Sequence, residues 1–277
     1  MVKIEKLDFG YKKNQQLFRE LNLELQSGNI YGLFGMNGAG KTTLLKLMSG
    51  LLFPKNGQCL IFEKDVSSRL PEILANIYVI PEEFVLPPVS IKSFVEMNAP
   101  FYPRFDYTLL DKYLKEFEIS NDKKLTAYSY GQKKKFLIAF GLATQTNVLL
   151  MDEPTNGLDI PSKSQFRRIM AAASTEEQCI IISTHQVRDL ASIIDHVIIL
   201  DNGTIIFKHN LMDISTRLTF GKIKDDDSAD DILYAEEVLG GKAAIRKNTG
   251  QDTAVDLELL FNGVIKNSEI MNEAIKS

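Results

Sequence analysis

The chain has 277 residues, of which 44% are hydrophobic and 25% are charged. These values are typical of a water-soluble protein with a substantial core, and the length predicts one large domain, or a main domain with a small appendage. The net charge of −4 excludes an overall basic field that would attract nucleic acid or anionic lipid, although a local basic patch stays open.

The sequence contains no pattern that predicts a signal peptide, a membrane-spanning helix or a disulfide framework. The first ten residues, MVKIEKLDFG, lack the apolar core of a signal peptide, and no run reaches the roughly 18 apolar residues that a span needs. Cys59 and Cys179 lie far apart without a partner motif, which favours buried, reduced thiols in a cytosolic protein. We therefore expect any work at a membrane to be done from the cytoplasm, through another polypeptide.

Apolar runs and helical patterns alternate along most of the chain. The start, VKIEKLDFGY, alternates apolar and polar residues as a half-exposed antiparallel strand does. Four continuous apolar runs indicate buried strands, at residues 29–35, 147–152, 179–184 and 196–200. Such runs, interleaved with helices, are typical of a parallel sheet covered on both faces. We predict an α/β fold with a mainly parallel sheet and an N-terminal antiparallel β portion.

The strand pattern disappears between about residues 86 and 145. Within this segment, SIKSFVEMNAPFYPRFDYTLLDKYLKEFEI predicts two short helices joined by a Pro-rich turn, and a further helix begins near Ser129. We interpret the segment as a helical subdomain inserted into the α/β core. The lysines at residues 133–135 are expected to form a solvated face of the last helix.

The composition changes again after about Met212. KIKDDDSADD predicts an acidic loop, and AIRKN and TAVDLELLF predict strand fragments of a small C-terminal appendage. We expect a main domain over residues 1–212 and an accessory region over residues 213–277.

A glycine-rich turn follows the first buried run. GMNGAGKTT satisfies the pattern G-x-x-x-x-G-K-[ST] between a strand and a helix, as a phosphate-binding loop requires. Glycines let successive N–H groups face an anion, and the helix N-terminus adds partial positive charge. Lys41 would reach the β- and γ-phosphates, and the Thr42 hydroxyl can ligate Mg²⁺. The predicted nucleotide-binding residues are Gly35, Met36, Asn37, Gly38, Ala39, Gly40, Lys41, Thr42 and Thr43.

Two acids follow the apolar run NVLLMD. Asp152 ends the predicted strand, where ligands bind in an open parallel sheet, and Glu153 comes next. An acid at the end of a buried run is costly without a cation, so Asp152 is assigned to Mg²⁺. Glu153 would orient and deprotonate an attacking water. The alternative is a pair of solvated turn acids.

With these motifs in order, residues 1–212 resemble the ATP-binding-cassette (ABC) ATPases, which have a P-loop NTPase core and use ATP and Mg²⁺. Tyr11 resembles the aromatic residue that stacks on adenine, and YSYGQ resembles the signature motif. PTNGLD resembles the loop whose Asp159 crosses a dimer interface, and STHQ supplies His185, similar to the histidine that contacts the γ-phosphate.

The signature motif implies a dimer. In the family, two cassettes pack head to tail, and the signature residues of one close over the γ-phosphate bound by the other. Ser129, Gly131 and Gln132 match that motif residue by residue. Taken alone, they also form an ordinary helix start with Ser129 as the N-cap, and the two roles are compatible because a helix start attracts anions.

Two residues depart from the family pattern. Tyr130 stands where the family has its first signature glycine, and a side chain there restricts the backbone and would crowd dimer closure. Gly131, the later glycine, is retained, so binding across the dimer is still expected. Glu82 stands where the family has a glutamine that contacts the metal and the attacking water. A carboxylate can also ligate Mg²⁺, so Glu82 is a candidate metal ligand, with an exposed loop acid as the alternative.

The resemblance implies the ATP-hydrolysing subunit of a membrane transporter, closest to exporter-type single cassettes. Its partners would be an identical or related second ATPase subunit and a separately encoded transmembrane permease, at the cytoplasmic face of the membrane. The main alternative is a soluble relative that acts on DNA or ribosomes, but the chain has one cassette, no heptad repeat and an acidic balance, so no nucleic-acid partner is expected. An unrelated P-loop kinase or GTPase would not explain the signature, Asp159 or His185.

Overall fold

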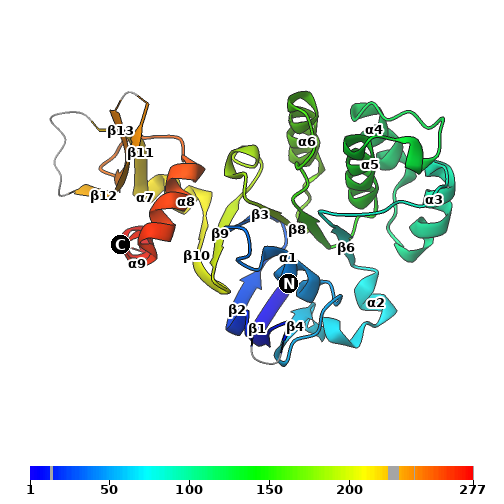
Figure 1. Ribbon diagram of the computed structural model, residues 1–277, viewed down its shortest axis with the longest axis horizontal. Helices are drawn as coiled ribbons and strands as arrows, with labels where there is room; N and C mark the ends of the chain where they lie inside the picture. Colours follow the sequence, from blue (N-terminus) through cyan, green and yellow to red (C-terminus); the bar gives the residue numbers. More distant parts are fainter. Residues whose placement is uncertain (13–14, 224–230, 240, 277) are drawn as a thin grey trace.

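The computed structural model describes residues 1–12, 15–223, 231–239 and 241–276, so most of the predicted acidic loop, residues 224–230, lies outside the described residues. Three sheets and their helices are arranged side by side, with the largest sheet in the middle (Figure 1). None of the described helices is long and apolar enough to span a bilayer.

The central sheet has six strands in the order β10-β9-β3-β8-β7-β6. Five of them run parallel, and β10 pairs with β9 in the antiparallel sense. The predicted parallel sheet is thereby confirmed. The strands are β3 (Asn29–Phe34), β6 (Ile77–Ile80), β7 (Val148–Asp152), β8 (Cys179–Thr184), β9 (His196–Asp201) and β10 (Thr204–Asn210).

Both faces of this sheet are buried, which explains the continuous apolar runs. In β3, Ile30 and Phe34 pack into the core on one face, while Tyr31 and Leu33 pack into the core on the other. The strands β7, β8 and β9 divide their side chains between the two cores in the same alternating way. Burial of both faces therefore favours apolar residues at successive positions of these strands.

The N-terminal antiparallel portion is confirmed as a four-stranded sheet in the order β2-β1-β4-β5. Helix α1 packs in the same core as this sheet and the inner face of the central one, and Figure 1 shows α1 between them. The elements are β1 (Val2–Phe9), β2 (Phe18–Leu25), α1 (Lys41–Met48), β4 (Asn56–Ile61), β5 (Lys64–Asp65) and α2 (Pro71–Leu74).

The inserted segment is helical, as predicted, and forms one end of the molecule (Figure 1). A polar residue caps each main helix: Ser90, Asp106, Ser129 and Asp159 accept hydrogen bonds from backbone N–H groups of the first turns. Helix α5 is buried on all sides from Phe136 onward, so it forms the axis of this part. The helices of this segment are α3 (Ile91–Asn98), α4 (Tyr107–Glu116) and α5 (Tyr130–Ala143), and α6 (Ile160–Ala173) follows after β7.

The C-terminal appendage is a three-stranded antiparallel sheet, in the order β11-β13-β12, with helices packed beside it. AIRKN lies mostly in a strand, as predicted, but TAVDLELLF does not. Asp256 caps a helix there, and its side chain accepts from two backbone N–H groups. The elements are α7 (Leu211–Arg217), β11 (Leu218–Lys222), β12 (Ile232–Val238), β13 (Gly241–Lys247), α8 (Leu257–Lys266) and α9 (Ser268–Lys276).

The register of the parallel strands brings the predicted motifs together. Phe34 pairs with Thr184, and Asp152 pairs with Ser183, so β3, β7 and β8 end at the same edge. The phosphate loop, Glu153 and His185 follow directly after these strand ends, and Asp152 is the last residue of β7. The edge therefore collects residues that lie far apart in the sequence.

Candidate functional site

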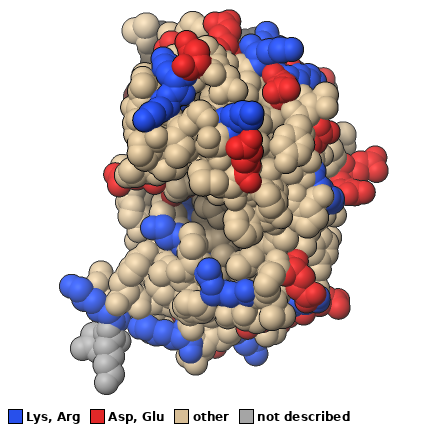
Figure 2. All heavy atoms as spheres, turned by 90° about the vertical axis from the view of Figure 1, so that its right-hand side faces the viewer, with Lys and Arg blue, Asp and Glu red and all other residues tan. Residues whose placement is uncertain are grey.

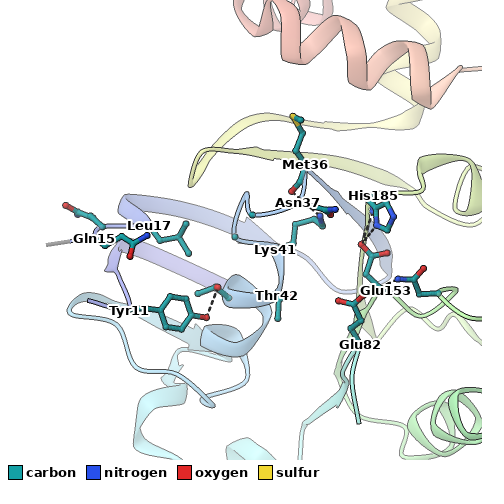
Figure 3. A pocket seen from close by; sticks show the side chains of 15 residues that line it. Tyr11, Gln15, Leu17, Met36, Asn37, Lys41, Thr42, Glu82, Glu153 and His185 are labelled. Atoms are coloured by element: carbon teal, nitrogen blue, oxygen red, sulfur yellow. Dashed lines mark hydrogen bonds and ion pairs between the residues drawn. The ribbon is translucent and has the colours of Figure 1, made fainter. Parts of the chain in front are cut away.

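A pocket of about 610 Å³ lies at this edge, a volume that suits a nucleotide-sized ligand. Tyr11 and Leu17 lie at one end of the pocket, Glu153 and His185 at the other, and Lys41 and Thr42 between them (Figure 3). The lining residues are Tyr11, Gln15, Gln16, Leu17, Met36, Asn37, Gly38, Gly40, Lys41, Thr42, Thr43, Glu82, Glu153, Asn156 and His185.

The glycine-rich loop turns back on itself before α1. Gly38 and Gly40 have φ angles of 83° and 111°, which glycine adopts without strain, and a Cβ at Gly40 would lie 2.9 Å from the Phe18 ring. The Lys41 Nζ donates to the Gly35 carbonyl oxygen at 2.7 Å and to the Met36 carbonyl oxygen at 3.3 Å. Burial lowers the pKa of Lys41. The ammonium group is thus held under the loop, at the centre of the pocket.

The side chains of Thr42 and Asp152, the two residues predicted to hold Mg²⁺ together, lie next to each other. The Thr42 hydroxyl donates to Asp152 Oδ2 at 2.7 Å, and the Ser183 hydroxyl donates to the other carboxylate oxygen. Asp152 is 4% exposed. A hydroxyl and a carboxylate oxygen side by side fit Mg²⁺, which takes one or two protein ligands and completes its shell with phosphate and water.

Glu153 is held by the residues that end β8. Thr184 Oγ1 donates to Glu153 Oε2 at 2.9 Å, and the His185 backbone N–H donates to Oε1 at 3.0 Å. The His185 Nδ1 lies 2.7 Å from the same Oε1 (Figure 3). Glu153 is buried, whereas the His185 side chain is 39% exposed. The carboxylate and the imidazole therefore act as one hydrogen-bonded pair at the end of the pocket.

Tyr11 lies at the opposite end of the pocket and is exposed, and its hydroxyl lies 2.9 Å from the Thr43 hydroxyl. The ring also packs edge-on against Phe9. An exposed ring beside the first turn of α1 is available for stacking on a flat ligand group.

Gly35 and Ala39 of the predicted set do not line the pocket. A Cβ at Gly35 would lie 2.5 Å from the Leu200 carbonyl oxygen, so this glycine allows β3 to pass β9 closely. Ala39 is 6% exposed and packs in the core beneath the loop.

The predicted signature residues also lie outside this pocket. Ser129 Oγ accepts from the Gln132 N–H, and the Gln132 side chain accepts from the Ser129 N–H, which forms a capping box at the start of α5. A Cβ at Gly131 would lie 3.1 Å from the Gly157 carbonyl oxygen. Asp159 caps α6 through the Ser162 N–H. Within one chain these four residues do not reach the phosphate loop's pocket.

The two departures from the family pattern lie next to each other. Glu82 lines the pocket, and its Oε1 accepts from Asn156 Nδ2 at 3.1 Å. The Tyr130 hydroxyl donates to the Glu82 carbonyl oxygen at 2.6 Å. Tyr130 is the first residue of α5 and has no positive φ, so its Cβ brings no backbone strain.

Sequence interpretation missed several residues of the site. Asn156 binds Glu82, and Ser183 and Thr184 bind the two acids. A detectable signal was the position of Ser183 and Thr184, because two hydroxyl residues directly before His185 end an otherwise apolar run. Gln15 and Leu17 gave no signal, since the pocket acquires them only through the packing of the N-terminal sheet.

Comparison with known proteins identifies the family. The family model described as ABC transporter matches residues 18–156, about half of the chain. The chain is 27% identical to the ABC transporter ATP-binding protein YtrB of Bacillus subtilis (strain 168) over 216 residues, which are 77% of this chain and 72% of the relative. It is 32% identical to the bacitracin transport ATP-binding protein BcrA of Bacillus licheniformis over 197 residues, which are 70% of this chain and 64% of the relative.

A solved structure supports the fold. An ATP-binding cassette described as dimeric, in a post-hydrolysis state with ADP and Pi, aligns with a TM-score of 0.67 and 22% identity, over 76% of this chain and 99% of that one. This confirms the predicted P-loop NTPase fold. The family match and the two Bacillus relatives confirm the prediction of an ATPase that uses ATP and Mg²⁺. The chain therefore belongs to the ABC transporter family, as one of its ATP-binding and ATP-hydrolysing subunits.

Proposed function

We propose that the chain hydrolyses ATP at a site shared between two cassettes. Lys41 and the loop N–H groups bind the phosphates, Tyr11 stacks on the adenine, and Thr42 and Asp152 hold Mg²⁺, with Glu82 as a further candidate ligand. When bound there, Mg²⁺ would supply positive charge to neutralise the phosphates. Glu153 orients and deprotonates the attacking water, and His185 contacts the γ-phosphate. Two observations carry this proposal: Glu153 lines the pocket beside Lys41, and Asp152 accepts a hydrogen bond from Thr42, which also lines it.

The second cassette supplies the signature residues. The capping box fixes the tip of α5, and N–H groups in the first turn of a helix attract anions. Because Ser129, Gly131, Gln132 and Asp159 do not line the pocket of their own chain, we assign them to the pocket of a partner cassette. The partner is a second copy or a related ATPase subunit.

A separately encoded membrane permease is the proposed partner of the helical subdomain, at the cytoplasmic face of the membrane. Figure 2 looks onto the end of the molecule that carries α3 and α4, where a largely uncharged area is flanked by charges of both signs. Exposed apolar residues come from this part of the chain, among them Val85, Met97, Phe101 and Tyr107. The PTNGLD motif and the single cassette favour an exporter-type subunit. Residues 213–277 are proposed as an accessory region to the cassette over residues 1–212.

The role of Glu153 can be tested by Glu153→Gln, which keeps the size of the side chain but cannot accept a proton at neutral pH. We expect ATP binding within about twofold of wild type and turnover lower by about 10²- to 10⁴-fold, the usual contribution of a general base. ATP should also trap the variant as a dimer, measured by size-exclusion chromatography with light scattering.

The matched control is Glu176→Gln, an exposed glutamate just before the start of β8, at the opposite end of this strand from the pocket, which should hydrolyse ATP at the wild-type rate. Wild-type turnover in Glu153→Gln would contradict the assigned base. A variant that is inactive but monomeric with ATP would contradict the shared site.

A further inference from the structure

Helix α5 holds a buried lysine that the roles assigned above do not use. Lys134 is fully buried, whereas the sequence predicted a solvated face for residues 133–135, so that prediction is wrong at this position. Its Nζ donates to the carbonyl oxygens of Pro81 at 3.1 Å and Glu82 at 3.0 Å. Burial lowers the pKa of Lys134 to about 8. A buried ammonium group is costly unless it is hydrogen-bonded, so these two contacts tie α5 to the loop that contains Glu82.

Tyr130, at the start of the same helix, also binds the loop that contains Glu82. Its hydroxyl donates to the Glu82 carbonyl oxygen, and its ring stacks on Phe84 with centroids 5.1 Å apart and planes 18° apart. The Tyr130 ring also lies against Gly157, where a Cβ would come within 2.8 Å of it. The Lys134 Nζ lies 5.4 Å from the centre of the Phe84 ring. Residues 81–84 are therefore held through hydrogen bonds, ring stacking and a cation–π contact.

These contacts fix the backbone from which the Glu82 side chain extends. The Glu82 carboxylate lines the ATP pocket with Lys41 and Glu153, and Asn156 donates to it. Lys134 and Tyr130 both bind the Glu82 carbonyl oxygen and so fix the backbone, while Asn156 holds the carboxylate that extends from it. The charge of Lys134 also offsets that of the carboxylates nearby.

We propose that Tyr130 and Lys134 are positioning residues for hydrolysis, which hold residues 81–84 on α5 so that the Glu82 carboxylate stays in the ATP pocket. This inference rests on the proposed function of the pocket. It also links the two departures from the family pattern, because the tyrosine in place of a glycine binds the backbone of the glutamate in place of a glutamine.

Steady-state ATP hydrolysis tests the proposal. Lys134→Met keeps the apolar stem and removes both hydrogen bonds, and we expect kcat to fall about tenfold with the KM for ATP within about twofold. Tyr130→Phe keeps the stacking and removes one hydrogen bond, so kcat should fall about threefold. The control Lys133→Met removes the neighbouring lysine, which is not buried, and should behave as wild type. A wild-type kcat in both Lys134→Met and Tyr130→Phe would overturn the proposal.

A double-mutant cycle separates positioning from a general loss of structure. If Lys134 acts through the Glu82 carboxylate, then Lys134→Met should cause no further loss of kcat in a Glu82→Ala background. A further tenfold loss in that background would overturn the proposal. The outcome is independent of the Glu153→Gln experiment, because that variant tests whether the pocket hydrolyses ATP as proposed, and the cycle tests what holds Glu82.

The solvent accessibility of residues 81–84 can also be measured without an activity assay. The chain has no tryptophan, so Phe84→Trp introduces a single fluorescent reporter into residues 81–84. Adding Lys134→Met to this variant should raise the quenching of the tryptophan by acrylamide at least about twofold, since a released loop is more accessible to solvent. Adding Lys133→Met should leave it unchanged. Equal quenching in the two double variants would overturn the proposal.

Discussion

Glu153 combines an unusual backbone with a fully bonded side chain. Its φ of 45° is in the left-handed region, which costs a non-glycine residue about 1 to 2 kcal/mol. Thr184 and His185 hold both carboxylate oxygens, so tertiary contacts maintain a conformation that the local sequence does not favour. Strain of this kind at a pocket is a feature of functional sites, and it agrees with the role assigned to Glu153.

The two cysteines allow a prediction about pH and reactivity. Burial raises the pKa of both Cys59 and Cys179 to about 12, above the ordinary value of 9. At pH 8 the reactive thiolate is thus almost absent in the folded state. The two thiols lower the free energy of unfolding only as the pH rises above 9, because the thiols of the unfolded chain ionise first.

We expect Ellman's reagent to leave both thiols largely unmodified in the native protein at pH 8, and to react with both in guanidinium chloride. Rapid reaction of either thiol without denaturant would contradict the burial of β4 or β8.

Among the helices and strands, the ones that could be predicted from the sequence are those whose apolar pattern depends on burial alone. The strands β3, β7, β8 and β9 are continuous apolar runs because both of their faces are covered. The phosphate loop and the acids after β7 were predictable because their chemistry requires fixed spacing. The strand prediction for the start of α8 is wrong because VDLEL alternates apolar and polar residues as a strand does, although Asp256 is also a suitable N-cap for a helix. The burial of Lys134 had no local signal, because only the loop after β6 supplies its partners.

The tip of helix α5 has both a structural and a proposed functional role, and two substitutions can separate them. Ser129→Arg removes the cap and places a bulky cation where the partner's ATP is expected, so hydrolysis should fall at least about tenfold while ATP binding by the monomer is retained. Ser90→Arg removes the corresponding cap of α3, where Ser90 accepts from the Ser93 N–H, without approaching the phosphate loop's pocket.

Loss of the cap alone should lower the free energy of unfolding in both variants by the roughly 0.5 to 2 kcal/mol that an N-cap contributes. The thermal midpoint should fall accordingly. Only Ser129→Arg should lose hydrolysis and the ATP-dependent dimer. Equal ATPase rates in the two variants would exclude a role of the α5 tip in the partner's site.

For the whole molecule, the appendage is packed against the cassette and not merely tethered to it. Ile245, Leu260 and Val264 belong to the same buried cluster as Ile199 and Phe207 of the central sheet. Arg188, which follows His185 by three residues, forms an ion pair with Glu258 at the start of α8. Exposed ion pairs add little, so the shared apolar core is what joins the two parts.

A shared core predicts that the appendage does not unfold before the cassette. Phe261→Trp places a single tryptophan on α8, and Phe94→Trp places one on α3, both at half-buried positions. In each variant, the tryptophan fluorescence and the far-UV circular dichroism should follow the same urea transition, as they do when the parts unfold together. If the appendage were an independent unit, the fluorescence of Phe261→Trp would change at lower urea than that of Phe94→Trp. The circular dichroism of both variants would then fall in two steps, because it reports on both parts of the chain. Coincidence in both variants would mean that deleting residues 213–277 exposes part of the cassette's own core, and that such a deletion destabilises the ATPase as well as removing the appendage.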